Sequence, residues 1–215
     1  MKAYFITGTD TNVGKTWVTL ALMQHFKNQN LSVLGMKPVA SGCEKINGEW
    51  QNSDALAIQK MGSQYVDYSV LNPYAYKLPI SPHLAGKKNP VKLETIFAHF
   101  QMLQKLANVL IVEGAGGLYA PLNETDTIAD LAKTLNAPII LVVAIRLGCI
   151  NHALLTFEAI KHSNLKCAGW IAVCNDADFD CVDLTIESIK NRTEALLIGT
   201  IPYLEKSTEF NFENN

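Results

Sequence analysis

The stretch from Gly8 to Thr16, which reads Gly-Thr-Asp-Thr-Asn-Val-Gly-Lys-Thr, constrains the fold of this chain more than any other stretch. An apolar run, Tyr4-Phe5-Ile6, precedes it, and an amphipathic run that begins at Trp17 follows it. This order predicts a strand, a tight loop and a helix that starts within Gly14-Lys15-Thr16. Such a loop surrounds phosphate oxygens with backbone N–H groups, and the positive end of the helix dipole faces the same anion.

The loop departs by one position from the usual pattern of Gly, four residues and Gly-Lys-Ser/Thr. Counting back from Gly14, the expected glycine falls on Thr9, whereas the nearest glycine is Gly8. An ordinary strand–turn–helix corner is the alternative, but the strand and helix patterns on both sides favour a phosphate loop. In such loops the lysine, here Lys15, reaches the β- and γ-phosphates, and the hydroxyl, here of Thr16, holds Mg²⁺.

Length and composition favour a single α/β domain that spans residues 1–215. The hydrophobic share of 48% and the charged share of 18% are ordinary for a soluble globular protein. With a net charge of −2, the sequence gives no reason to expect nucleic acid or an anionic membrane as the main partner. Met1 leads directly into the first predicted strand, and no apolar run reaches the ~18 residues of a membrane span, so we expect a cytoplasmic location.

The five cysteines and five histidines favour neither disulfides nor a transition-metal site. The cysteines are odd in number and contain no Cys-x-x-Cys pair, and the histidines contain no His-x-x-x-His pair. We therefore expect reduced thiols with mainly structural roles.

Strand and helix patterns alternate along the chain, which predicts a mostly parallel sheet of about seven strands with helices on both faces. After the first strand, the expected strands cover residues 31–36, 109–112, 139–144, 167–173 and 196–201, and the expected helices include 127–135, one ending near 162, and 181–192. Residues 62–90 show little periodicity, and a lid, a substrate loop and a plain surface connection all fit them. The polar tail over residues 205–215 is expected to be loose.

Ligands of an open parallel sheet bind beyond the carboxyl ends of its strands, so the residues at those ends are the candidates for a site. In this sequence the candidate segments are 8–16, 37–43, 113–117, 146–152, 175–176 and 202–203. We expect them to gather at one edge of the sheet.

Three side chains at or near these ends have two interpretations each. Glu113 is either a carboxylate that serves a metal ion or a turn carboxylate. Asp54 is either a second Mg²⁺ ligand or, as its spacing alone favours, an acid at the start of a helix. Lys37 is either a lysine that enters solvent or an ammonium that stabilises charge on a transferring phosphoryl group. Arg146 and His152 are expected to be structural or surface residues.

Six sequence blocks together resemble the ATP-dependent dethiobiotin synthetases, in family order over nearly the whole chain. They are Gly8–Thr16, Lys37-Pro-Val-Ala-Ser-Gly42, Asn52-Ser-Asp-Ala55, Asn72-Pro-Tyr74 with Ser81-Pro-His83, Glu113-Gly-Ala-Gly-Gly117 and Leu147-Gly-Cys-Ile-Asn-His152. The resemblance implies a single-domain P-loop NTPase-like fold and an ATP- and Mg²⁺-dependent cyclo-ligase of biotin biosynthesis. Members of this family make dethiobiotin from 7,8-diaminopelargonic acid and CO₂ through a carbamate and a carbamic-phosphoric anhydride, and they release ADP and phosphate.

The resemblance also assigns roles to individual residues. It implies that Lys37, Lys15 and Thr11 are catalytic, and that Ser41 and Thr11 contact the carbamate or the substrate. Mg²⁺ would be held by Thr16, Asp54 and Glu113. ATP would contact the phosphate loop and the end of the strand before residue 117, at Asn12, Val13, Gly14, Lys15, Thr16, Trp17, Asp54, Glu113, Gly114, Ala115 and Gly116. Residue 12 is acidic in many family members, so with Asn12 only the backbone N–H is expected to serve phosphate.

Two further sites follow from the resemblance. The substrate carboxylate would be bound at a homodimer interface, between a helix start on one subunit and a loop on the other, formed by Gly148, Cys149, Ile150, Asn151, Gly117 and Leu118. Adenine and the rest of the nucleotide would be contacted by Asn175, Asp176, Pro202, Tyr203, Leu204 and Glu209. A helix start can bind a carboxylate without an arginine, because its backbone N–H groups are free.

Two other families remain as alternatives. A related amidoligase would need a glutaminase domain with a nucleophilic cysteine, and 215 residues leave no room for one. A partition-type ATPase, switched by its nucleotide to bind a macromolecular partner, would carry an extra lysine early in the phosphate loop, where this chain has Thr9, Asp10 and Thr11.

Overall fold

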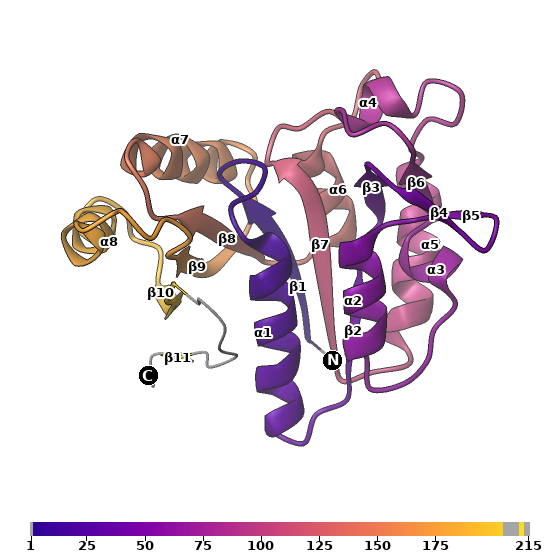
Figure 1. Ribbon diagram of the computed structural model, residues 1–215, viewed down its shortest axis with the longest axis horizontal. Helices are drawn as coiled ribbons and strands as arrows, with labels where there is room; N and C mark the ends of the chain where they lie inside the picture. The colour runs from indigo at the N-terminus through magenta and orange to yellow at the C-terminus, as the bar shows by residue number, and fades with distance from the viewer. Residues whose placement is uncertain (1, 204–210, 213–215) are drawn as a thin grey trace.

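A computed structural model describes residues 2–203 and 211–212 of the chain. In this part of the chain the centre is a seven-stranded sheet with strand order β11-β10-β9-β8-β1-β7-β2 (Figure 1). Six of these strands run parallel, and β11 pairs antiparallel with β10. The strands are β1 (Lys2–Gly8), β2 (Val33–Met36), β7 (Val109–Gly117), β8 (Ile139–Ala144), β9 (Cys167–Val173), β10 (Leu197–Ile201) and β11 (Asn211–Phe212).

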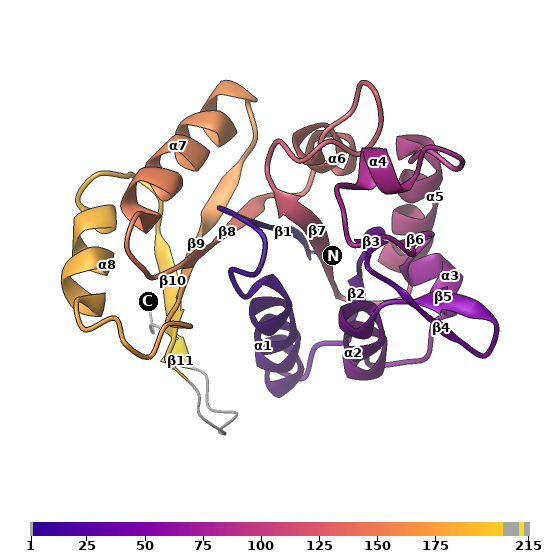
Figure 2. The ribbon, with the colours of Figure 1, turned by 45° about the horizontal axis from the view of Figure 1, so that its top comes forward.

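Helices cover both faces of the sheet, which confirms the predicted architecture. On one face α1 (Lys15–Asn28) and α2 (Ser53–Met61) lie side by side (Figure 2). The later helices pack on the other face; they are α5 (Leu93–Gln104), α6 (Ile128–Leu135), α7 (Cys149–His162) and α8 (Val182–Lys190).

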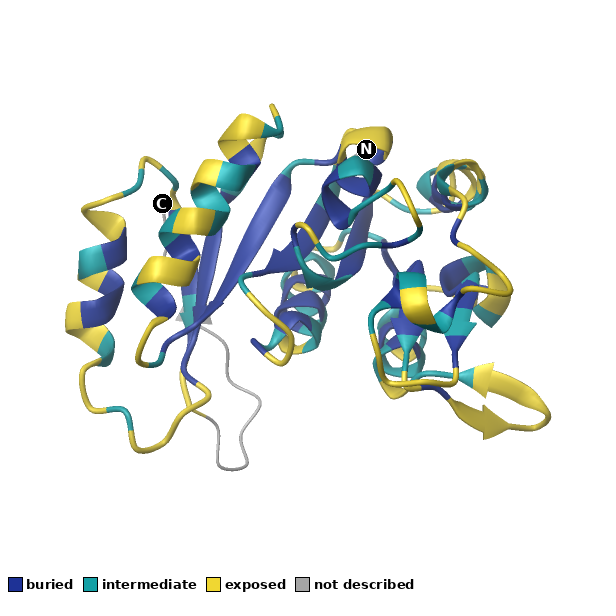
Figure 3. Ribbon diagram, turned by 90° about the horizontal axis from the view of Figure 1, so that it is seen from above, coloured by how far each residue is buried: buried dark blue, intermediate teal, exposed yellow. Residues whose placement is uncertain are grey.

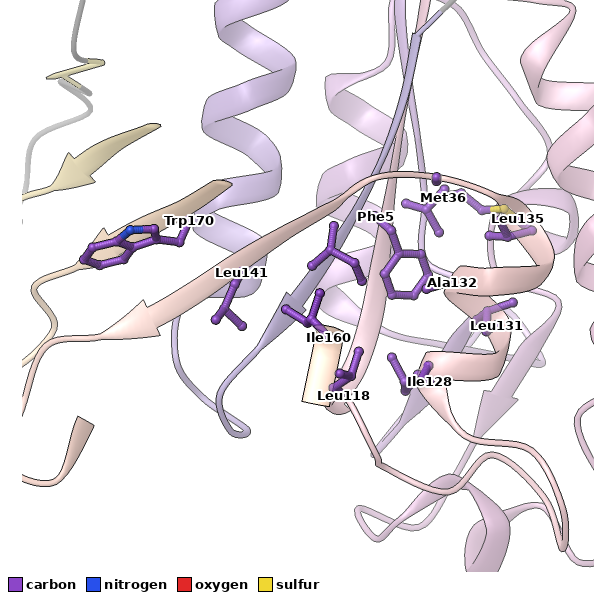
Figure 4. Packing of buried hydrophobic residues seen from close by; sticks show 14 of the residues in the cluster. Phe5, Met36, Leu118, Ile128, Leu131, Ala132, Leu135, Leu141, Ile160 and Trp170 are labelled. Atoms are coloured by element: carbon purple, nitrogen blue, oxygen red, sulfur yellow. The ribbon is translucent and has the colours of Figure 1, made fainter. Parts of the chain in front are cut away.

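Successive residues of β1 show why the sheet needs cover on both sides. Phe5 packs in the core cluster under the later helices, with Leu131 and Ala132 of α6 (Figure 4), whereas Ile6 packs in the cluster under α1 and α2. Both side chains are fully buried. β8 is buried at every residue, as the dark strands at the centre of Figure 3 illustrate. Continuous apolar runs are typical of parallel strands that are covered on two faces.

Most predicted boundaries hold, and those that shift do so for local reasons. The predicted strands 139–144 and 167–173 match β8 and β9. The strand predicted to start at Leu31 starts at Val33, because the Leu31 N–H still bonds the carbonyl of Phe26 at the end of α1. The predicted helix 127–135 begins one residue later, since Thr127 is its N-cap and forms a capping box with Asp130. The predicted elements 181–192 and 196–201 are shorter, as α8 and β10.

Two stretches without predicted elements contain regular structure. The polar stretch after residue 43 is a hairpin of β4 (Glu44–Ile46) and β5 (Glu49–Gln51), turned by Asn47 and Gly48 with φ values of 51° and 90°. Residues 62–90 hold short elements, one of which pairs in parallel with β3 (Val39–Ser41). These elements are α3 (Tyr68–Leu71), β6 (Tyr74–Tyr76) and α4 (Pro82–Ala85).

The end of the chain is described only in part. Most of the predicted loose tail, residues 205–215, lies outside the described residues, and within it Asn211–Phe212 forms β11. No helix in the described ranges is long and apolar enough to cross a membrane.

Candidate active site

The carboxyl ends of several strands meet at one cavity of about 980 Å³. Its walls come from the loop between β1 and α1, from the residues after β2, from the start of α2, from the end of β7 and from Asn175 after β9. Four of the six predicted strand-end segments, 8–16, 37–43, 113–117 and 175–176, therefore contribute to this lining, and 146–152 and 202–203 do not.

The phosphate loop takes its shape from two residues in left-handed conformations, Asn12 with φ 58° and Gly14 with φ 93°. A Cβ atom on Gly14 would lie 2.9 Å from Cγ1 of Val173, so both the backbone angle and the close packing require glycine. Val13 turns into the core, where it is 1% exposed, and the Val18 N–H bonds the Gly14 carbonyl to start α1. The loop is thus open toward the cavity and anchored beneath it.

Lys15 is buried in the loop, and no carboxylate of the described residues forms an ion pair with it. Its Nζ donates to the backbone carbonyl of Asp10 at 2.9 Å. Burial lowers the pKa of Lys15 to about 8, although Glu113 and other acids act against this shift. A buried ammonium whose hydrogen-bond partner among the described residues is a single carbonyl favours the binding of an anion.

Lys37 is also buried, and it lies between two carboxylates. Its Nζ is 2.5 Å from Oε1 of Glu113 and 3.0 Å from Oδ2 of Asp54. Burial alone would lower the pKa of Lys37, but the charges and hydrogen bonds of Glu113 and Asp54 outweigh it and raise the pKa. With 6% of its surface exposed, Lys37 is not the solvent-facing lysine of the simpler interpretation.

Glu113 is fully buried and has one oxygen to spare. Its Oε1 accepts a hydrogen bond from the Thr16 hydroxyl at 2.9 Å as well as one from Lys37, whereas its Oε2 has no partner among the described residues. Asp54 lies in the first turn of α2, which Asn52 caps, so its interpretation as an acid at the start of a helix is confirmed. Its carboxylate also contacts Lys37, and its role as a Mg²⁺ ligand stays a prediction. Two carboxylates, a hydroxyl and an unpartnered buried oxygen fit a hard divalent cation, which prefers oxygen ligands.

Ser41 and the end of β7 also line the cavity. The buried hydroxyl of Ser41 has no hydrogen-bond partner in the described part of the chain. Thr11 and the segment 114–117 line the cavity too. A wall formed by residues 79–82 completes it, and sequence reasoning had left this wall inside a segment of uncertain role.

Comparisons with known proteins identify the family. A family model described as an AAA domain matches residues 2–211. The ATP-dependent dethiobiotin synthetase of Aromatoleum aromaticum is 44% identical to the chain, over 94% of the chain and 91% of the relative. That of Cellvibrio japonicus is 42% identical, over 96% and 92%. The chain belongs to the ATP-dependent dethiobiotin synthetase family.

Solved structures with a similar fold carry other names. The MinD cell division protein of Aquifex aeolicus matches with a TM-score of 0.60 at 15% identity, over 96% of the chain and 84% of that protein. A ParA family ATPase of Chlorobium tepidum matches with a TM-score of 0.58 at 14% identity, over 95% and 85%. These likenesses show a shared P-loop fold, and the much closer sequence relatives favour dethiobiotin synthetase over the partition-type alternative.

The cavity brings together most of the residues that the resemblance to dethiobiotin synthetases had selected. Those lining it are Thr11, Asn12, Gly14, Lys15, Thr16, Trp17, Lys37, Ser41, Asp54, Glu113, Gly114, Ala115, Gly116, Gly117 and Asn175. Sequence reasoning assigned no individual site role to the remaining lining residues, although some of them, such as Asn52, Ser81 and Pro82, lie in blocks that carry the resemblance; these residues are Leu20, Val39, Ala40, Asn52, Ala57, Ala120 and the wall 79–82.

The remaining selected residues lie elsewhere in the described structure. Val13 and Leu118 are buried in the core clusters. Gly148, Cys149, Ile150 and Asn151 lie at the start of α7, outside the lining of the cavity. Asp176, Pro202 and Tyr203 are exposed beyond β9 and β10, while Leu204 and Glu209 fall outside the described residues.

Proposed function

We propose that this chain forms the ureido ring of dethiobiotin from 7,8-diaminopelargonic acid, CO₂ and ATP, and releases ADP and phosphate. The observation that carries the proposal is the buried ammonium of Lys37, which lies beside a phosphate loop and in contact with two carboxylates. A site that transfers a phosphoryl group to a carbamate needs fixed positive charge next to the triphosphate and the acceptor.

The reaction has three steps whose atoms balance. One amine of the substrate adds to CO₂ and loses a proton, which gives a carbamate. A carbamate oxygen then attacks the γ-phosphorus of ATP, forming the carbamic-phosphoric anhydride as ADP leaves. Finally the second amine attacks the carbonyl carbon and loses a proton, which closes the ring and expels phosphate. Holding the amines and the phosphoryl group together in one cavity is the main contribution of the protein.

Two lysines and two hydroxyls supply the charge and the hydrogen bonds for these steps. Lys15 would hold the β- and γ-phosphates on the loop, and Lys37 would stabilise the carbamate and the phosphoryl group during transfer. Thr11 and Ser41 would hydrogen-bond the carbamate or the substrate. The buried Ser41 hydroxyl, which is without a partner in the described residues, supports this role because such a group gains most from a ligand.

The acidic residues fit a magnesium ion. Thr16, Asp54 and Glu113 would hold Mg²⁺, with the unpartnered Oε2 of Glu113 as one donor. When bound, Mg²⁺ neutralises part of the charge on the β- and γ-phosphates. The adenine would lie near Asn175, whose amide can both donate and accept, with Asp176, Pro202 and Tyr203 nearby.

We also propose a cytoplasmic homodimer, as the substrate carboxylate would lie between subunits. Gly148–Asn151 at the start of α7 would bind the carboxylate through backbone N–H groups, opposite Gly117 and Leu118 of the other copy. A large apolar side chain directly precedes this helix start on the surface, since Leu147 is 92% exposed. Contact with a second copy would remove it from water.

A direct assay tests the function. Purified protein is supplied with 7,8-diaminopelargonic acid, bicarbonate and Mg-ATP, and phosphate release and dethiobiotin are measured together. The expected result is phosphate release that depends on the diamine, with one dethiobiotin per phosphate. A rate of phosphate release that does not depend on the diamine, or that depends on DNA or lipid vesicles instead, would reject this function in favour of a partition-type ATPase.

A further inference from the structure

The contact between Lys37 and Asp54 joins two separate elements, and a buried side chain braces one of them. Asn72 is 3% exposed and lies just after α3. Its Nδ2 donates to the backbone carbonyl of Lys37 at 2.5 Å, and the Lys37 N–H donates to the carbonyl of Leu71 at 3.1 Å. Both backbone groups of Lys37 are therefore fixed by residues 71 and 72.

The same asparagine connects to the helix that carries Asp54. The Tyr68 hydroxyl donates to Oδ1 of Asn72 at 2.8 Å and accepts the backbone N–H of Asn52, also at 2.8 Å. Asn52 in turn caps α2 by accepting the N–H of Ala55 at 3.2 Å. A chain of hydrogen bonds thus runs from the Lys37 carbonyl to the first turn of α2, and the Lys37–Asp54 ion pair closes it into a ring.

The direction of every hydrogen bond in this ring is determined. The Lys37 carbonyl can only accept, so the Asn72 amide nitrogen must face it and the Asn72 oxygen must face Tyr68. The backbone N–H of Asn52 can only donate, so the single proton of the Tyr68 hydroxyl goes to Asn72. Burial raises the pKa of Tyr68 to about 12, which keeps that proton in place at neutral pH. The ring has one satisfied arrangement and is consequently well suited to hold a geometry.

We propose that Asn72 and Tyr68 are positioning residues, which set the distance between the Lys37 ammonium and the Asp54 carboxylate. Neither side chain lines the cavity or touches the reacting atoms. Their effect passes through the strand end that bears Lys37 and the helix start that bears Asp54. The inference rests on the proposed function, in which Lys37 faces the phosphoryl group and Asp54 faces the metal.

The test removes one hydroxyl and compares it with a matched hydroxyl in the same segment. Tyr68→Phe breaks the ring, whereas Tyr76→Phe removes a buried hydroxyl that donates to the carbonyl of Asn89 at 2.7 Å and has no link to the ring. Tyr68→Phe is expected to lower kcat about tenfold or more, because small misplacements of reacting groups are costly. Tyr76→Phe is expected to keep the wild-type kcat.

Binding without turnover separates positioning from a general loss of stability. ADP affinity in the presence of a chelator should be unchanged in Tyr68→Phe, since the phosphate loop is intact. The affinity of the ADP complex for Mn²⁺ should fall about tenfold, because Asp54 is no longer held. Asn72→Asp retains an acceptor for Tyr68 but places a carboxylate oxygen where the amide donated to the Lys37 carbonyl, so it should show the same pattern.

The outcomes distinguish this inference from the proposed function. Wild-type kcat and wild-type Mn²⁺ affinity in both variants would overturn the positioning role, even if both melt at lower temperatures. A variant that does not fold leaves the other to decide, because each breaks a different hydrogen bond. If the wild-type protein itself shows no diamine-dependent phosphate release, the proposed function fails, and the Mn²⁺ affinities still report on the ring.

Discussion

The two lysines of the cavity are held in opposite ways. Lys15 belongs to a contiguous loop, where Gly14 and Asn12 shape the backbone and the only partner that its ammonium has among the described residues is the Asp10 carbonyl. Lys37 is held by segments far apart in the chain, since Glu113 is 76 positions away and Asn72 is 35. Burial lowers the pKa of Lys15, whereas two carboxylates raise that of Lys37.

This difference divides the cavity into two electrostatic halves. The Lys15 half presents positive charge and backbone N–H groups, and so it favours the binding of an anion. In the Lys37 half, two carboxylates share one ammonium, and the spare oxygen of Glu113 favours a cation. A metal–triphosphate, which is both anion and cation, matches the two halves together.

The largest expected effect comes from removing the ammonium of Lys37. Lys37→Met keeps an unbranched apolar stem but leaves the buried Glu113 without its ammonium, which costs about 3–5 kcal/mol of folding free energy. We expect kcat for dethiobiotin formation to fall by about 10³ or more, as for lost transition-state donors. The measurement is diamine-dependent phosphate release.

A control keeps this result specific to the buried lysine. Lys45→Met removes an exposed ammonium from the β4–β5 hairpin and should leave kcat unchanged. ADP binding in the presence of a chelator shows that Lys37→Met retains the phosphate loop. A Lys37→Met protein with native ADP affinity and more than a tenth of wild-type kcat would contradict a catalytic Lys37.

The same contrast explains what could be predicted from the sequence. The phosphate loop is encoded by nine neighbouring residues, so motif and flanking periodicity sufficed to predict its loop-to-helix geometry. Lys37 had two open interpretations, because its burial depends on Leu71 and Asn72, which fold back from a segment without clear periodicity. No local sequence pattern predicts the contact of Lys37 with Leu71 and Asn72.

Short elements were missed for a related reason. β3 and β6 have three residues each, too few to show alternation, and their mutual pairing makes them strands. Asn47-Gly48 is a strong turn signal, but its flanks are polar and exposed, so the stretch resembled a loop rather than a hairpin. The long strands β8 and β9 were predictable because continuous apolar runs suffice.

The second prediction tests the phosphate-loop half. Gly14→Ala would place a methyl group 2.9 Å from Val173 at a φ of 93°, so the loop must distort. ADP affinity is expected to fall about 100-fold, with a loss of about 1–3 kcal/mol in unfolding free energy from backbone strain. Isothermal titration with ADP and thermal melts provide the measurements.

Gly48 offers a control with nearly the same backbone angle. Its φ is 90°, but a Cβ there would meet nothing within 4 Å. Gly48→Ala should therefore cost about 1 kcal/mol in stability and leave ADP affinity alone. Equal ADP affinities in the two variants would mean that the packing against Val173 does not shape the loop.

The third prediction concerns the cation half by itself. The Lys37 ammonium contacts the same carboxylates that would hold Mg²⁺, so it competes with the metal in the empty protein. Lys37→Met should bind Mn²⁺ ten- to 100-fold more tightly than wild type in the absence of nucleotide, although it is catalytically inactive. Electron paramagnetic resonance of free Mn²⁺ measures this affinity. Unchanged or weaker binding would show that the ammonium does not occupy the place of the metal.

The smallest effect is the pH dependence that Lys15 contributes. Its pKa of about 8 in the folded protein lies below the ordinary 10.5 of the unfolded chain. Between these values the unfolded chain binds more protons at Lys15, so the contribution of Lys15 to the stability of the empty protein rises as the pH rises from about 8 to 10.5. The raised pKa of Lys37 acts only at higher pH, where its contribution to stability is lost.

Binding of an anion must reverse the shift of Lys15. A phosphate group favours the charged ammonium, so ADP binding at pH 9 should take up a proton and be several-fold weaker than at pH 7. Calorimetry in two buffers of different ionisation enthalpy measures the uptake, with metal chelated so that only the phosphate loop responds. Lys15→Met should abolish the proton uptake, and Lys37→Met should retain it. Proton uptake that persists in Lys15→Met but vanishes in Lys37→Met would contradict this assignment, because Lys37 would then be the group that takes up the proton.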